Sequence, residues 1–356
     1  MEHSRLTALR QRLKQQRLDA VLISSLPNIR YLTGFTGSHA LVIVSRDSAQ
    51  FFTDPRYRSQ STQEVRGLRR IVSRRSPLDS LGHCGLPRGS RRLGFEAQHT
   101  TYSHYRELKK RFPGVSLVPM FDLVEDLGVA KEKKEIDLIR RAVRITEEVL
   151  GEVLALVRPG IAERDIAAEI SYLQRRKGAD GDAFAPIVAS GERGALPHAG
   201  ASAKRLKNRE LVTLDFGCRV EGYGSDLSRT VGLGKIPGKT RAHYEAVLTA
   251  QTLAIESIKE GLPARDLDAV ARRSLRCRGL GKYFVHSLGH GLGLHIHEKP
   301  RIAPLSCDRL RAGNVITIEP GIYVPGRYGI RIEDDVVVKE GGFEVLTTST
   351  RDLILL

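Results

Sequence analysis

The sequence predicts a two-domain protein of mixed α/β architecture, and three observations support this prediction. The chain has 356 residues, which is enough for two domains that each bury a core. Residues 1 to about 125 alternate between helical and strand patterns. At 124–157 the pattern changes to a charged stretch followed by one long amphipathic helix. We therefore expect one domain at 1–127 and a second at 128–356.

The first domain is predicted to open with an amphipathic helix, because Leu6, Leu9 and Leu13 fall on one stripe. Its other elements follow from apolar runs bounded by turn residues. They are a buried strand at 19–25, a turn at Pro27-Asn28, a hairpin of strands at 39–45 and 50–54, and a helix within 101–114 that ends at Pro113-Gly114.

The second domain is predicted to begin with the long helix, whose apolar residues recur at near-helical spacing from Ile136 to Leu156. Arg158-Pro159-Gly160 stops this helix. Several strands are expected after it, together with three more helices, at 163–177, 240–259 and 265–278.

Composition narrows the class of protein. No apolar run reaches the about 18 residues that a membrane-spanning helix needs, and the N-terminus has no apolar signal region. None of the four cysteines forms a CxxC pair, which indicates reduced thiols in a cytoplasmic protein. They are Cys84, Cys218, Cys277 and Cys307.

The chain is basic, with a net charge of +16 and a pI near 9.9. Eight arginines fall within residues 66–92, which raises the question of nucleic-acid binding. That stretch has no aromatic side chain to stack on bases. A solvated arginine-rich face is therefore favoured over a nucleic-acid site.

The first candidate functional residues are a pair of aspartates within 211–234. If the turn between the two strand-like runs is centred between Val220 and Glu221, Asp215 lies opposite Asp226 and both point the same way. Two like charges in that position are destabilising unless a cation lies between them. The alternative is that one aspartate faces solvent and the other serves the turn.

Further ligand candidates occur near the C-terminus. Glu319 and Glu333 each end a β-branched run, where a surface glutamate is unusual. The segment HSLGHGLGLHIHEKP (286–300) gathers four histidines among glycines that allow close backbone packing, and we assign His290 to the acids. Four carboxylates and one imidazole suit two divalent ions, with Mn²⁺ or Co²⁺ favoured and Zn²⁺ as an alternative.

These residues lie in motifs that resemble the Xaa-Pro peptidases, prolidase and aminopeptidase P, of the pita-bread metallopeptidase family. The resemblance implies a creatinase-type α/β domain followed by a pita-bread catalytic domain. The motifs occur in the family's order at 18–44, 189–202, 214–230, 286–302, 316–326 and 329–335.

The resemblance also implies roles for individual residues. Five metal ligands would be Asp215, Asp226, His290, Glu319 and Glu333, with Asp226 and Glu333 bridging two ions. In catalysis, His198 and His297 would donate hydrogen bonds, and Glu319 would accept and later donate a proton. The residues that bind substrate would be His286, Arg301, Tyr323 and Arg331. An ordinary ion pair with a ligand carboxylate is the alternative for each arginine.

The expected activity is metal-dependent hydrolysis of Xaa-Pro peptide bonds by a homodimer. The compact length and Arg301 favour a dipeptidase over an aminopeptidase P. The rival class is a non-catalytic binding module on the same fold, associated with nucleic acid through 66–92. The intact ligand set argues against that rival.

Overall fold

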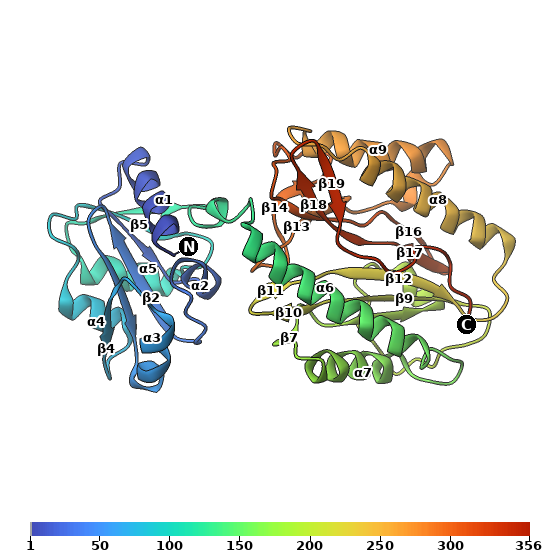
Figure 1. The fold of residues 1–356 in the computed structure, drawn as a ribbon, viewed down its shortest axis with the longest axis horizontal. Coiled ribbons are helices and arrows are strands. Elements are labelled where there is room, and N and C mark those ends of the chain that lie inside the picture. The colour runs from blue at the N-terminus through green and yellow to red at the C-terminus, as the bar shows by residue number, and fades with distance from the viewer. Residues whose placement is uncertain (1) are drawn as a thin grey trace. The chain divides into compact units, whose positions relative to one another are not determined.

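The computed structural model describes residues 2–356, and the chain divides into two compact units, one up to Gly128 and one from Val129. Each unit has its own sheets and helices (Figure 1). Within the described residues, no helix is long and apolar enough to cross a membrane. The architecture is mixed α/β, as predicted.

The first unit is built on a six-stranded sheet with the order β4-β3-β2-β1-β5-β6. The strands β1, β5 and β6 run parallel, and the predicted β2–β3 hairpin is confirmed. The strands are β1 (Ala20–Ile23), β2 (Ala40–Ser45), β3 (Ala49–Thr53), β4 (Arg69–Val72), β5 (Arg92–Glu96) and β6 (Ser116–Met120).

The helices of this unit are α1 (Glu2–Gln15), α2 (Leu26–Thr33), α3 (Arg58–Glu64), α4 (Pro77–Cys84) and α5 (Tyr102–Arg111), with short 3₁₀ turns η1 (Pro55–Tyr57) and η2 (Glu125–Leu127). The predicted stripe of α1 is buried. The predicted turn at Pro27-Asn28 is wrong, because α2 begins at Leu26. Proline is tolerated in the first helical turn, where its missing N–H has no helical acceptor.

The second unit has four long helices at the predicted places: α6 (Lys133–Leu154), α7 (Glu163–Arg176), α8 (Gly238–Glu256) and α9 (Ala264–Cys277). Helices α6 and α7 pack on one group of strands, β8, β9 and β12, through a shared apolar core. Helices α8 and α9 pack on a second group, β15 to β18. The strands therefore lie between two helical layers (Figure 1).

The strands of this unit form several small sheets, with orders β12-β9-β8, β11-β10-β7, β14-β13-β15-β18-β19 and β16-β17. Their bounds, with the two 3₁₀ turns, are β7 (Gly181–Asp182), β8 (Ile187–Ser190), η3 (Gly191–Ala195), β9 (Leu211–Phe216), β10 (Cys218–Val220), β11 (Tyr223–Gly224), β12 (Leu227–Gly232), η4 (Gly281–Tyr283), β13 (Gly289–Gly291), β14 (Glu298–Ile302), β15 (Val315–Ile318), β16 (Gly321–Val324), β17 (Tyr328–Arg331), β18 (Asp334–Lys339) and β19 (Gly342–Val345).

The register of the β9–β12 hairpin differs from the prediction. Its tight turn is Glu221-Gly222, with φ of 46° and 77°, which are the positive values that two-residue hairpin turns require. Asp215 therefore lies opposite Ser228 and not opposite Asp226. The shift is two residues, so both aspartates stay on the same face of the hairpin.

Candidate metal centre

Five predicted ligands come together from two hairpins and one short strand. Asp215 lies in β9, Asp226 immediately before β12, and His290 in β13. Glu319 directly follows β15, and Glu333 joins β17 to β18. Three of the acids lie where a strand begins or ends, and Asp215 projects from within β9, so these side chains can point at a common centre.

His290 faces the acids with one ring nitrogen. Its Nε2 lies 3.7 Å from Asp226 Oδ2 and 3.4 Å from Glu319 Oε1. Single ligand atoms of Asp226, His290 and Glu333 all lie within 4.8 Å of one another. His290 Nδ1 lies 3.0 Å from the Gly291 carbonyl, so it donates there and leaves the Nε2 lone pair for a cation.

Glycines allow this strand to approach its neighbours. A Cβ on Gly289 would lie 1.9 Å from the Thr317 carbonyl oxygen, and a Cβ on Gly291 would lie 2.0 Å from that of Lys299. Only glycine fits at both positions, which confirms the close backbone packing predicted around His290.

Asp215 is held from the side by Arg331. The Arg331 Nη2 donates to Asp215 Oδ2 at 2.5 Å, while Asp215 Oδ1 is buried without a hydrogen-bond partner. Arg331 Nε donates to Ser228 Oγ, which in turn donates to Glu333 Oε2, both at 2.8 Å. An ion pair between Arg331 and a ligand carboxylate is therefore present.

The electrostatics of the cluster favour either neutral acids or a bound cation. Burial, followed by repulsion from neighbouring carboxylates, raises the pKa of Asp226 and of Glu333 well above the usual range. Burial likewise raises the pKa of Glu319 to about 8. The unpartnered Asp215 oxygen, the crowded acids and the single imidazole lone pair together fit divalent cations.

The predicted catalytic histidines surround this cluster. The His297 ring lies 4.4 Å from the His290 ring, centroid to centroid. Burial, followed by repulsion from His198, lowers the pKa of His297, so the ring is neutral near pH 7. His198 is exposed, and it also repels His286, which places it near both rings.

The predicted substrate-binding residues divide into two groups. His286 Nε2 lies 2.9 Å from the Tyr323 hydroxyl, which accepts from Arg331 Nη1 at 2.6 Å. These three residues form one connected wall beside the acids. Arg301 belongs to β14 and has no hydrogen bond with these three described residues, and its backbone N–H donates to Asp308. Its exposed guanidinium makes no hydrogen bond or ion pair within the described part of the chain.

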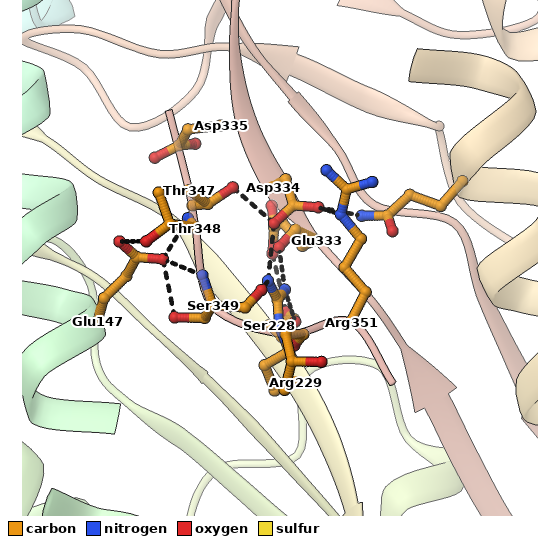
Figure 2. Close-up of polar contacts among 12 residues, drawn as sticks. Glu147, Ser228, Arg229, Glu333, Asp334, Asp335, Thr347, Thr348, Ser349 and Arg351 are labelled. Carbon is orange, nitrogen blue, oxygen red and sulfur yellow. Dashed lines mark hydrogen bonds and ion pairs between the residues drawn. The ribbon is translucent and has the colours of Figure 1, made fainter. Parts of the chain in front are cut away.

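One ion pair that supports the site was missed at the sequence level. Arg229, which is 1 % exposed, donates through Nη1 to the carbonyls of Ser228 and Glu333, and through Nη2 to Asp334 Oδ1 at 2.8 Å (Figure 2). It thus fixes the backbone of a ligand. Arg229 lies within the strand LSRTVG, and Asp334 comes shortly before a run of three valines; charge beside such β-branched residues was the available signal.

Two carboxylates on the margin of the site were also missed. Asp335 Oδ2 accepts the backbone N–H of Asp226 at 3.0 Å. Glu147 on α6 accepts the N–H and hydroxyl groups of Thr348 and Ser349, which ties down the C-terminal segment (Figure 2). Neither contact has a local sequence signal.

Both parts of the chain match known protein families. Residues 5–127 match the Creatinase/Prolidase N-terminal domain, and residues 137–340 match metallopeptidase family M24. The chain is 40% identical to an uncharacterized peptidase, YqhT, of Bacillus subtilis over 99% of this chain and all of that one.

Two solved structures share the whole fold. An Xaa-Pro dipeptidase from Bacillus anthracis is 37% identical, with a TM-score of 0.97 over 100% of both chains. An X-Pro aminopeptidase from Thermotoga maritima is 35% identical, with a TM-score of 0.91 over 99% of both chains. The chain therefore belongs to metallopeptidase family M24, within its Xaa-Pro peptidases, and is an enzyme of that family.

Proposed function

We propose that this enzyme hydrolyses Xaa-Pro peptide bonds with two divalent cations. The observation that carries the proposal is the convergence of five donors, which would hold the ions: the buried Asp215, Asp226, His290 and Glu333, and the partly buried Glu319. The names of the two similar solved structures support the substrate class.

When bound, the cations supply Lewis acidity that activates a water molecule and stabilises negative charge on the attacked carbonyl oxygen. We propose Mn²⁺, because oxygen ligands predominate and only one imidazole is present. Co²⁺ and Zn²⁺ are the alternatives that reconstitution would compare.

The side chains of the enzyme carry out the proton transfers. An Xaa-Pro bond is a tertiary amide, so its nitrogen has no hydrogen and must be protonated as it leaves. Glu319 accepts the proton that the attacking water loses and delivers it to the proline nitrogen. His198 and His297 donate ring N–H groups to the carbonyl oxygen as its charge grows.

We propose further that dipeptides are the preferred substrates. A free carboxylate at the proline end needs a cation to offset its desolvation, and a guanidinium can bind it in bidentate fashion. The exposed Arg301 guanidinium, which has no side-chain partner among the described residues, supports this assignment. Aminopeptidase activity on longer peptides is the alternative. A cytoplasmic location and a homodimeric assembly stay predictions.

The test is reconstitution of the metal-free enzyme with Mn²⁺, followed by kcat/KM on Xaa-Pro and on Xaa-Pro-Yaa-Zaa. We expect hydrolysis of both at the same bond, with the dipeptide preferred. Asp226→Ala should abolish hydrolysis and lose at least one ion by elemental analysis. Full activity of that variant with unchanged metal content would overturn the proposal of a two-cation site.

A further inference from the structure

We infer that Glu163 is a positioning residue that holds both ends of the loop carrying His198, an inference that rests on the proposed function. The loop is the segment 190–202, called the His198 loop below. It follows β8 and includes η3. Glu163 is the first residue of α7, and its side chain is fully buried.

One carboxylate grips both ends of this loop. Glu163 Oε1 accepts the N–H and the hydroxyl of Ser190, each at 2.8 Å. Oε2 accepts the N–H of Ser202 at 3.1 Å and its hydroxyl at 2.7 Å. Arg193, inside the loop, donates its Nε to Oε2 at 2.9 Å.

These donors keep Glu163 ionised. Burial acts to raise the pKa of Glu163, but the hydrogen bonds from Ser202, Ser190 and Arg193 together outweigh it, so the pKa lies below its ordinary value. A charged acceptor strengthens each of these hydrogen bonds. This set of hydrogen bonds to Glu163, called the Glu163 clamp below, is therefore present at neutral pH.

The far side of the loop rests on the wall of the active site. A Cβ on Gly329 would lie 1.9 Å from the Gly194 carbonyl oxygen, so the two backbones touch. The Pro197 carbonyl accepts from Arg331 Nη1 at 3.3 Å. The residue before His198 is thus tied to the guanidinium that binds Asp215.

His198 depends on this support. Its ring is exposed, and no hydrogen bond of the ring is found among the described residues. The place from which the ring can reach the substrate is therefore set by the backbone of the loop, and so by Glu163 at the base. If His198 donates to the carbonyl oxygen of the substrate, displacement of the loop withdraws that donor from the transition state.

The first test is a double-mutant cycle on a dipeptide substrate. Glu163→Gln replaces an acceptor oxygen by an amide that faces N–H donors, so we expect kcat to fall by about 10–100-fold. KM and metal content should change little. In a His198→Ala background the same substitution should change kcat by no more than about twofold, because the group it positions is gone. Losses that multiply in the double mutant would overturn the inference.

The second test does not depend on activity. Hydrogen exchange of the Ser190 and Ser202 amides should accelerate in Glu163→Gln. Glu147→Gln is the matched control, because Glu147 grips Thr348 and Ser349 in the same way but holds no part of the loop. Unchanged exchange in Glu163→Gln, or equal acceleration in the control, would overturn the inference.

Two further measurements apply if Glu163→Gln does not fold or if the proposed function fails. Ser202→Ala removes the hydroxyl donor but keeps the N–H donor, so it weakens the Glu163 clamp less than Glu163→Gln does. It is the variant to measure if Glu163→Gln does not fold. It should give a smaller fall in kcat and faster exchange confined to the same loop, and no change in either would overturn the inference. If the wild-type enzyme does not cleave Xaa-Pro bonds, the proposed function fails, while the exchange measurement still decides whether Glu163 holds the loop.

Discussion

Arg331 shows at the scale of one residue how a buried cation organises this site. Its guanidinium donates to Asp215, Ser228, Tyr323 and the Pro197 carbonyl. A buried ion pair contributes little net stability unless its remaining donors find acceptors, and here each of the three guanidinium nitrogens has at least one acceptor. Arg331 therefore fixes the orientation of a ligand carboxylate and of the tyrosine beside it.

Lys131 is a second buried cation with a supporting role, here for the segment that carries His297. Its buried ammonium group forms an ion pair with Glu298, the residue that follows His297, and donates to the Val129 carbonyl. The ion pair anchors one end of the segment that presents His297 to the cluster. This support is consistent with the proposed role of His297 as a hydrogen-bond donor.

We predict that His297→Ala lowers kcat by about 10²–10³, the usual cost of losing an oxyanion donor. Metal content should stay near that of the wild type, because His297 is not among the proposed ligands. His104→Ala, at an exposed histidine of α5, is the control and should leave kcat unchanged. Loss of metal in step with loss of activity would show that His297 is a ligand.

We predict that Arg301→Ala raises KM for Xaa-Pro dipeptides by a factor of about 10–150, from a charged hydrogen bond of about 1.5–3 kcal/mol. Longer Xaa-Pro peptides should be much less affected, because their carboxylate lies elsewhere. Amidating the dipeptide should mimic the substitution in the wild type and add little in the variant. Equal losses on short and long substrates would favour an aminopeptidase.

The β9–β12 hairpin shows what happens at the scale of an element. Its two-residue turn decides which residue faces Asp215, and its period of two decides that Asp215 and Asp226 share a face. Both aspartates still point to the same side of the hairpin, because a shift of two residues does not change the side to which a residue points. The ligand pair therefore depends more on strand alternation than on the turn.

We predict that Gly222→Ala lowers the free energy of unfolding by about 1–2 kcal/mol, since an alanine is strained at φ 77°. The matched control is Gly151→Ala in α6, where a Cβ would meet open space and a helix former should add up to about 1 kcal/mol. Denaturant titration measures both. A stabilised Gly222→Ala variant would contradict the turn geometry.

At the scale of the whole molecule, each unit has its own apolar core. In the second unit, the free-energy cost of burying charge falls mainly on the acids of the metal centre. Carboxylates of that centre are buried between the two helical layers. Without cations, they are accommodated more easily in their neutral form. The stability of the metal-free enzyme should therefore depend on pH in the opposite sense to that of a protein with paired surface acids.

We predict that the chelated enzyme loses stability as the pH rises. The pKa of Glu319 is raised by burial from 4.5 to about 8, so its stabilising neutral form is fully present below 4.5 and is lost as the pH passes about 8. Divalent ions should remove this loss. Calorimetry should thus show a gap in Tm between metal-loaded and chelated enzyme that widens from pH 5 to pH 8; a constant gap would contradict the prediction.

The sequence by itself determined the order of the elements, the mixed α/β class and the residue types of the metal centre. Periodicity located the stripe of α1, the β2–β3 hairpin and helices α5 to α9, because these depend on neighbouring residues. The acids stood out because charge at the end of a β-branched run conflicts with its surroundings. Family motifs then assigned the acids to one site.

Tertiary structure alone decided which groups support that site. Arg229 meets the carbonyl of Glu333, which lies 104 residues further along the chain, and Glu163 meets Ser190 and Ser202 across 27 and 39 residues. Such contacts carry no local period, since they follow from how helices and strands pack. The same holds for α2, where tertiary context selects a helix in a stretch whose Pro27-Asn28 pair equally suits a turn. Local patterns encode elements and chemistry, whereas packing over long sequence separations decides how rigidly that chemistry is held.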